Sequence, residues 1–267
     1  MNEKIIEVKN LSKNFGQVQA VRNISFEVKQ SEIFAFLGSN GAGKSTTIKM
    51  LITLLAPTSG DAVINGYSLI HHPADVRKAI GYVPQMISVD GALTVQENLM
   101  FMAHLYDVPY RECTMRIQQI LAFLDLEKYA RALVRTLSGG MIRKLEVGQA
   151  MLHHPHLLFL DEPTAGLDPI AKRNIWEHLI ELRDTFGTTI FFSTHDMEEA
   201  EEVSDRVAIM NAGEIAVIGS VSELKERTKK KDATLEDAFI FFAGNSLQPG
   251  GNFHDIKRTR QTQQRLG

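Results

Sequence analysis

The chain has 267 residues, of which 44% are hydrophobic and 23% are charged, as in ordinary soluble globular proteins. Its formal net charge of -3 gives no general attraction to nucleic acid, and its single cysteine, Cys113, excludes an intrachain disulfide. No apolar run approaches the roughly eighteen residues needed to cross a bilayer, and the first residues lack a signal-peptide pattern. We therefore expect one large domain or two subdomains, in a chain that stays in the cytoplasm.

The N-terminal part of the chain has the alternating pattern of half-buried strands. Apolar and polar side chains alternate over residues 5–8 and 24–28, and Asn65-Gly66 after the apolar residues 62–64 is typical of a tight hairpin turn. This pattern predicts an antiparallel β portion. Phe15 lies at a turn within it, where it is either a core aromatic or a platform on which a purine ring stacks.

A glycine-rich loop lies inside this β portion. It follows the apolar residues 33–37, precedes a stretch with helical spacing, and fits the pattern G-x-x-x-x-G-K-[ST]. Glycines let successive N–H groups converge on an anion, and the helix dipole adds positive potential. Lys44 then reaches the outer phosphates of a nucleotide, and the Ser45 hydroxyl holds Mg²⁺. The predicted nucleotide contacts of this glycine loop are Gly38, Ser39, Asn40, Gly41, Ala42, Gly43, Lys44, Ser45 and Thr46.

The pattern becomes helical after the next short strand. Gln85 ends that strand and is expected at the edge of a sheet. Thr94 and Glu97 form a capping box that begins one helix, and a second helix is predicted over about residues 115–126. We expect a helical insertion over about residues 88–136. The apolar face of its first helix is predicted to be Val95, Leu99, Met102 and Leu105. Three methionines are either core or an adaptable docking surface for a partner, namely Met86, Met100 and Met102.

A second group of glycines opens a later helix. Ser138 is a good N-cap, and Gly139 and Gly140 leave N–H groups open to an anion at the start of that helix. These three residues therefore predict a second phosphate cradle.

Two carboxylates end a strand that the pattern predicts to be buried. The apolar residues 157–160 are followed by Asp161 and Glu162, and unpaired carboxylates at such a place are costly. We expect Asp161 beside the Mg²⁺ held by Ser45, and Glu162 to polarise a water for attack on the γ-phosphate. Because side chains alternate along a strand, the two carboxylates should point in different directions. His195 follows the next buried strand and is expected to contact the γ-phosphate.

The C-terminal part ends in weaker signals. A hairpin is expected at residues 211–213, and Ser220 and Glu223 form a capping box for a short helix. Residues 229–231 predict a solvated linker, and residues 233–242 a last amphipathic helix. The tail from Ser246 has a net charge of +3 from Lys257, Arg258, Arg260 and Arg265 against Asp255. Its composition predicts disorder, with contact to anionic lipid or RNA as an alternative. The histidine pairs lack metal-site spacing, so Mg²⁺ is the only expected metal.

These motifs together resemble the nucleotide-binding subunit of an ABC transporter. The resemblance runs over about residues 5–219. It is specific because the motifs stand in the family's order. The glycine loop matches Walker A, Gln85 the Q-loop, residues 137–140 the signature and residues 157–162 Walker B. Gly166-Leu167-Asp168 matches the D-loop, and His195 the switch histidine. Phe15 stands where the family usually has Tyr, and Met141 replaces the usual Gln after the signature. Phe still stacks on adenine, and Met leaves the cradle intact.

The resemblance implies a fold class, cofactors and residue roles. It implies an α/β fold with a P-loop NTPase core built on a parallel sheet, an antiparallel β subdomain and an inserted α-helical subdomain. It implies ATP and Mg²⁺ as cofactors, with Lys44, Glu162 and His195 as catalytic residues. Ser45, Gln85 and, through water, Asp161 are the implied Mg²⁺ ligands. The expected divisions are an ATP-binding domain over residues 1–228, a linker and helix over 229–245, and a basic tail over 246–267.

The resemblance also implies partners and a location. The daunorubicin-resistance type of exporter ATPase is similar in residues 53–60, 137–145 and 234–239. This implies an ATP-hydrolysing exporter subunit, working with a separate transmembrane permease at the inner face of the membrane, and no specific nucleic acid. The alternative is a soluble ATPase of the same type that acts on the ribosome or DNA, although such proteins usually carry two ATPase domains or a long coiled coil.

The two phosphate cradles suggest a dimer. Both open helices at the carboxyl edge of one sheet and face the same way, so one nucleotide does not easily fill both within a chain. We expect Ser138, Gly139 and Gly140 of one protomer to contact the γ-phosphate held by Lys44 of a second copy or a homologous subunit.

Overall fold

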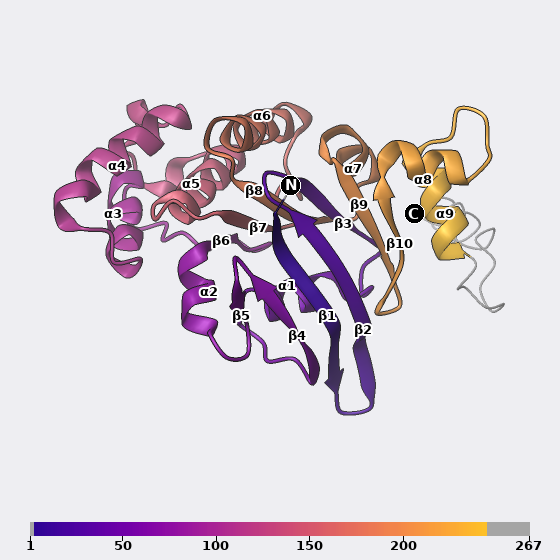
Figure 1. Cartoon of the computed structure of the whole chain (residues 1–267). Helices are drawn as coiled ribbons and strands as arrows, with labels where there is room; N and C mark the ends of the chain where they lie inside the picture. Colours follow the sequence, from indigo (N-terminus) through magenta and orange to yellow (C-terminus); the bar gives the residue numbers. More distant parts are fainter. Residues whose placement is uncertain (1–2, 245–267) are drawn as a thin grey trace, which may run out of the picture.

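The computed structural model describes residues 3–244, which contain two β-sheets with helices around them (Figure 1). One sheet has the strand order β10-β9-β3-β8-β7-β6, and the other has the order β2-β1-β4-β5. The predicted basic tail, residues 246–267, lies outside the described residues. The strands are β1 (Lys4–Phe15), β2 (Val18–Lys29), β3 (Ile33–Leu37), β4 (Ser59–Ile64), β5 (Tyr67–Ser68), β6 (Ile80–Val83), β7 (Leu157–Asp161), β8 (Thr189–Thr194), β9 (Arg206–Asn211) and β10 (Glu214–Ser220).

The six-stranded sheet is parallel except for one edge. Strands β6, β7, β8, β3 and β9 run parallel, and β10 pairs antiparallel with β9 after the predicted hairpin. Every residue of β3, β7 and β8 is buried, as expected for strands covered on both faces. The apolar runs that predicted the buried strands β7 and β8 are therefore confirmed.

The four-stranded sheet is antiparallel, as the alternating N-terminal pattern predicts. Its predicted tight turn is confirmed, because Asn65 and Gly66 have φ values of 48° and 83° between β4 and β5. Two consecutive positive φ values are the geometry that makes Asn-Gly the preferred hairpin dipeptide. Strand β1 pairs with both β2 and β4. Figure 1 shows these strands as a layer separate from the six-stranded sheet.

The helices gather around the sheets, with α3, α4 and α5 at one end of the molecule and α8 and α9 at the other (Figure 1). Within residues 3–244, no helix is long and apolar enough to cross a membrane. The helices are α1 (Lys44–Leu51), α2 (Pro73–Ala79), α3 (Val95–Leu105), α4 (Tyr110–Phe123), α5 (Gly139–Met151), α6 (Pro169–Phe186), α7 (Met197–Val203), α8 (Val221–Arg227) and α9 (Leu235–Gly244), with short 3-10 turns at Glu127–Tyr129 and Val134–Thr136.

Helix boundaries follow the capping signals better than the apolar spacing. Both predicted capping boxes form, at Thr94 before α3 and at Ser220 before α8. Helix α4, however, begins at Tyr110 directly after Pro109, five residues earlier than the apolar spacing predicted. The first two residues of the helix, Tyr110 and Arg111, are exposed and continue no apolar repeat, so periodicity alone does not mark its start.

The exposed side of the helical insertion differs from the prediction. Leu105 is 61% exposed, because Val95, Leu99 and Ala103 form the buried stripe at i, i+4 and i+8 and Leu105 falls outside it. Met86 is 81% exposed, so the core alternative is wrong for that side chain. The other two methionines, Met100 and Met102, are partly buried against the core.

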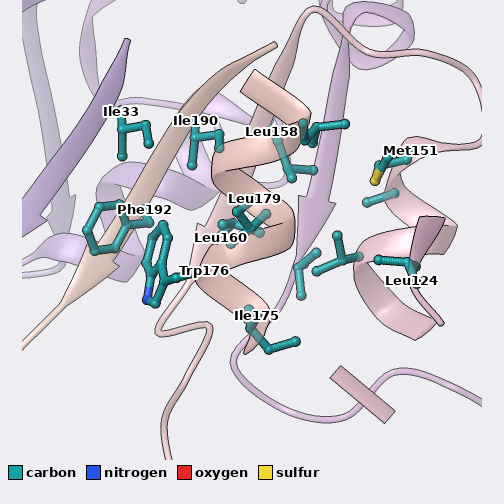
Figure 2. Close-up of a cluster of buried hydrophobic side chains, with 14 of the residues drawn as sticks. Ile33, Leu124, Met151, Leu158, Leu160, Ile175, Trp176, Leu179, Ile190 and Phe192 are labelled. Atoms are coloured by element: carbon teal, nitrogen blue, oxygen red, sulfur yellow. The ribbon is translucent and has the colours of Figure 1, made fainter. Parts of the chain in front are cut away.

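Two hydrophobic clusters lie on the two faces of the six-stranded sheet. Along β3, Ile33, Ala35 and Leu37 enter the cluster under the helices, whereas Phe34 and Phe36 enter the cluster under the antiparallel sheet. This alternation has the two-residue period of a strand. Figure 2 shows the first cluster, where Trp176 of α6 faces Phe192 of β8 with ring centroids 4.6 Å apart.

Replacing Phe191 with alanine is expected to lower the free energy of unfolding by about 3–5 kcal/mol. The Phe191 ring is fully buried in the second cluster, with its centroid 5.2 Å from that of Phe159 and 5.5 Å from that of Phe36. Denaturant unfolding measures the effect. The control is Phe186→Ala, at a residue that is 62% exposed, where we expect a change within about 1 kcal/mol. Equal effects at both positions would contradict this description of the core.

Candidate functional site

The glycine loop connects the end of β3 to the start of α1. Two of its glycines have no room for a side chain: a Cβ on Gly38 would lie 2.5 Å from the Met210 carbonyl oxygen, and one on Gly43 would lie 2.6 Å from that of Ala20. Gly43 also has a φ of 107°, which L side chains rarely adopt. It precedes α1, whose first turn has no side-chain cap in the described part of the chain. The loop therefore presents open N–H groups, which suit an anion.

A polar cavity of about 490 Å³ lies over this loop. Residues 40–46 line it together with Gln85, Glu162 and His195, so the structure brings together side chains from four predicted motifs. A larger cavity of about 630 Å³ lies at the other end of the strands, where Pro155 and Thr188 precede β7 and β8. Since ligands of parallel α/β sheets bind outside the carboxyl ends of the strands, the smaller cavity is the candidate site.

Glu162 contacts three other predicted site residues. Its Oε2 accepts a hydrogen bond from Gln85 Nε2 at 3.1 Å, and its Oε1 lies 3.1 Å from His195 Nδ1. Lys44 Nζ is 3.8 Å from the same Oε1 and donates to the carbonyl oxygens of Gly38 and Ser39. Burial lowers the pKa of the Lys44 ammonium, and the nearby carboxylates oppose that shift.

A backbone turn places the Glu162 carboxylate. Strand β7 ends at Asp161, and Glu162 has a φ of 49°, in the left-handed region that costs a non-glycine residue about 1–2 kcal/mol. Its N–H donates to the carbonyl oxygen of Ser193 at 3.1 Å and to the Ser193 hydroxyl at 3.2 Å, which holds the turn. The two carboxylates do contact different groups, but this turn, rather than strand alternation, separates them.

Asp161 and Ser45 form a pair of oxygen donors. Ser45 Oγ donates to Asp161 Oδ1 at 3.0 Å, and Ser193 Oγ donates to the same oxygen at 2.6 Å. A hydroxyl beside a buried carboxylate fits the oxygen preference of Mg²⁺. Among residues 3–244, no three His, Cys, Asp or Glu side chains gather as a ready-made metal site. A cation bound here would therefore take most of its ligands from phosphates, water and neutral side chains.

Phe15 lies apart from these groups. It is 50% exposed at the end of β1, so the core alternative is wrong, and it does not line the cavity over the glycine loop. The Lys13 ammonium lies 5.3 Å from the ring centroid. From the same hairpin, Ala20 of β2 reaches the cavity wall. Stacking of a purine on Phe15 stays a prediction.

The second predicted cradle is also separate from the first. Ser138 caps α5 as predicted, since its Oγ accepts a hydrogen bond from the Met141 N–H at 3.3 Å. Neither Ser138 nor the two following glycines line the cavity over the glycine loop. Within a single chain, the glycine loop and the cradle of Ser138, Gly139 and Gly140 therefore lie on different surfaces.

Two residues of the site region were not predicted. The Ser193 hydroxyl donates to the Asp161 carboxylate and accepts from the Glu162 backbone N–H, and a serine at the end of an apolar strand was a signal that could have found it. Glu199 is buried and accepts hydrogen bonds from Trp176 Nε1 at 2.8 Å and from Thr164 and Thr194. It stands in a run of acidic residues, so nothing in the pattern distinguished it.

The comparisons with known proteins show the family of the chain. A sequence model of the family described as ABC transporter matches residues 21–165. The linearmycin resistance ATP-binding protein LnrL of Bacillus subtilis is 39% identical over 223 residues, covering 84% of this chain and 71% of the relative. The Nod factor export ATP-binding protein I of Ralstonia nicotianae is 39% identical over 82% of this chain and 68% of its own length. The probable multidrug ABC transporter ATP-binding protein YbhF of Escherichia coli is 38% identical, but the chain spans only 41% of it.

Solved structures have the same fold. An ATP-binding subunit of an ABC transporter superimposes with a TM-score of 0.80 at 32% identity, covering 89% of this chain and 99% of that one. A dimeric ATP-binding cassette in a post-hydrolysis state, bound to ADP and Pi, gives a TM-score of 0.72 at 25% identity, over 80% of this chain and 98% of that one.

Proposed function

Because the chain belongs to the ABC transporter family, as an ATP-binding ATPase domain, we propose that it powers an exporter whose membrane-spanning part is a separate chain. The observation that carries the catalytic part is Glu162, which lies within 4 Å of Lys44, Gln85 and His195 beside the glycine loop. The names of LnrL and of the Nod factor relative, which refer to resistance and export, support the direction of transport.

The proposed reaction is hydrolysis of the γ-phosphate. The N–H groups of the glycine loop and the Lys44 ammonium bind the phosphates, while Ser45, Asp161 and Gln85 would hold Mg²⁺. The cation would supply charge neutralisation between the phosphates. Glu162 takes a proton from water as the water oxygen attacks the γ-phosphorus, and the bond from that phosphorus to the bridging oxygen breaks to release ADP. His195 would contact the γ-phosphate from the end of β8.

We propose that two chains complete each site. The separation of the signature residues Ser138, Gly139 and Gly140 from the glycine-loop cavity within one chain supports this arrangement. The cradle of one protomer would contact the ATP bound by the other, which is a second copy or a homologous subunit. Hydrolysis would then release the pair.

A permease is the proposed partner at the helical insertion. Large apolar side chains are exposed just before the insertion, at Met86 and Ile87, and within it, at Phe101, Leu105 and Tyr110. A protein partner that packs on this segment would cover these apolar side chains. The net charge of -3 gives no support to the alternative of a ribosome- or DNA-bound ATPase. The chain would lie at the inner face of the membrane through this partner.

Copurification tests the transporter assignment. The chain, tagged at its N-terminus, is isolated from host membranes in mild detergent, and its copurifying proteins are identified. A polytopic membrane protein in about equal amount is the expected result for a permease complex. Recovery only with ribosomes or nucleic acid in the soluble fraction would replace the proposal with the alternative.

Replacing Phe15 with alanine is expected to raise the KM for ATP by about tenfold, because a base stacked on an aromatic side chain gains about 1–3 kcal/mol. Phe15→Tyr should stay within about twofold of the wild type, since both rings offer the same stacking face. Steady-state ATPase kinetics measure both values. An unchanged KM in Phe15→Ala would exclude stacking at this position.

A further inference from the structure

A buried ion pair lies on α5, the helix that follows the signature. Arg143 Nη1 lies 2.9 Å from Glu146 Oε2, and the two side chains are 6% and 1% exposed. The contact has an ion-pair distance but not hydrogen-bond angles, so Glu146 Oε2 has no hydrogen-bond partner in the described part of the chain. Buried pairs of this kind add little to stability, because desolvation opposes their attraction. The proposed reaction also uses neither residue.

The remaining polar atoms of the pair hold a segment from another part of the fold. Arg143 donates from Nη1 to the Pro84 carbonyl oxygen at 2.7 Å and from Nη2 to that of Gln85 at 3.1 Å. Glu146 Oε1 accepts hydrogen bonds from the Ser88 N–H at 2.6 Å and from its hydroxyl at 2.9 Å. The backbone of residues 84–88, which follows β6, is therefore held at both ends by α5.

This attachment joins two parts of the proposed mechanism. The Gln85 backbone is bound to α5, while its side chain donates to Glu162 Oε2 at 3.1 Å. The same helix begins at Gly139 and is capped by Ser138. Because residues 84–88 are bound to α5, a movement of the signature end that is carried by this helix would be passed to Gln85.

We propose that Arg143 and Glu146 are positioning residues that make Gln85 and the signature move as one body. The inference rests on the proposed function, and it names the side chains that link the two sites within a chain. Engagement of Ser138 by the partner's ATP would then be passed to Gln85, which already contacts Glu162 in the single chain, so that the chemistry at one site depends on the cradle at the other.

A second ion pair in the same region supplies a matched control. Arg116 and Glu112 lie on α4 with Nη2 and Oε2 2.6 Å apart, and Arg116 also donates to the Leu152 carbonyl oxygen. This pair thus resembles the Arg143 pair in charge and in holding a neighbouring backbone, but its side chains are more exposed, at 18% and 42%. None of its partners lines the cavity over the glycine loop.

The test compares the paired replacements Arg143→Met with Glu146→Met and Arg116→Met with Glu112→Met. Removing both members avoids an unpaired buried charge, so both proteins should fold. The first should lower kcat by about tenfold or more, since displacement of a catalytic group by about 1 Å costs up to 100-fold. It should leave the KM for ATP within about twofold, because the glycine loop is intact. The control pair should leave kcat within about twofold of the wild type. Equal kcat losses in both proteins, or none in the first, would overturn the proposal.

Two further measurements separate positioning from a general structural role. Arg143→Lys keeps the charge but cannot span two carbonyl oxygens, so kcat should fall while Tm stays within about 3 °C of the wild type. A wild-type kcat in this variant would refute the proposal. Hydrogen exchange without nucleotide should be faster at the Ser88 amide in the Met pair than in the wild type. That readout needs no ATPase activity, so it stays interpretable even if the wild-type protein is inactive, a result that would count against the proposed function. Unchanged exchange at the Ser88 amide would contradict the attachment of residues 84–88 to α5.

Discussion

Replacing Glu162 with glutamine is expected to lower kcat for ATP hydrolysis by about 100-fold or more, the contribution of general-base catalysis. Glutamine keeps the size of the side chain and an oxygen that accepts from Gln85 Nε2, but it takes no proton from water. The binding groups of the glycine loop are unchanged, so the dissociation constant for ATP should stay close to that of the wild type. Phosphate release and equilibrium binding of a fluorescent ATP analogue measure the two quantities.

The matched control for this variant is Glu177→Gln. Glu177 is an exposed residue of α6 whose one ion-pair partner among residues 3–244 is Arg173, four residues earlier, so its replacement should leave kcat within about twofold. A Glu162→Gln protein with more than about a tenth of the wild-type kcat would exclude Glu162 as the general base.

Replacing Lys44 with methionine is expected to raise the dissociation constant for ATP by about 100-fold, because a charged hydrogen bond contributes up to about 3 kcal/mol. The ammonium now donates to the carbonyl oxygens of Gly38 and Ser39, and these bonds keep it over the loop where phosphates would bind. Methionine fills similar space without the buried charge, so loss of binding should not come from loss of folding. Titration calorimetry measures the affinity, and thermal unfolding checks the fold.

Lys49→Met is the control for the lysine. Lys49 lies on the same helix α1, is exposed, and does not line the cavity. Its replacement should change the dissociation constant by no more than about threefold, the size of a screened surface charge effect. Wild-type affinity in Lys44→Met would show that the loop binds phosphate without its lysine and would contradict the assigned role.

Local patterns predicted much of this fold. Apolar runs predicted β3, β7 and β8, and Asn65-Gly66 predicted the turn between β4 and β5. The order of strands across the sheet was not predictable in this way, because β3 lies between β8 and β9, far away in sequence. The start of α4 was also missed, since Tyr110 and Arg111 are exposed there and continue no apolar repeat.

The candidate site was predicted as a set of residues but not as a geometry. Motif residues such as Lys44 and Glu162 carry strong local signals, and the structure brings them to one cavity. The hydrogen bond between Ser193 and Glu162 joins segments 31 residues apart, and that between Arg143 and Gln85 joins segments 58 residues apart. Such contacts depend on strand order and helix packing, and these do not follow from periodicity.

The central claim is that two chains share each ATP, and intermolecular crosslinking tests it most directly. Asn40→Cys and Ser138→Cys are introduced together with Glu162→Gln and Cys113→Ser, because Cys113 is the only native cysteine. With ATP and Mg²⁺, oxidation should yield a disulfide-linked dimer on a non-reducing gel, and the band should be absent without nucleotide. A protein that binds ATP and yields only monomer would contradict the shared site.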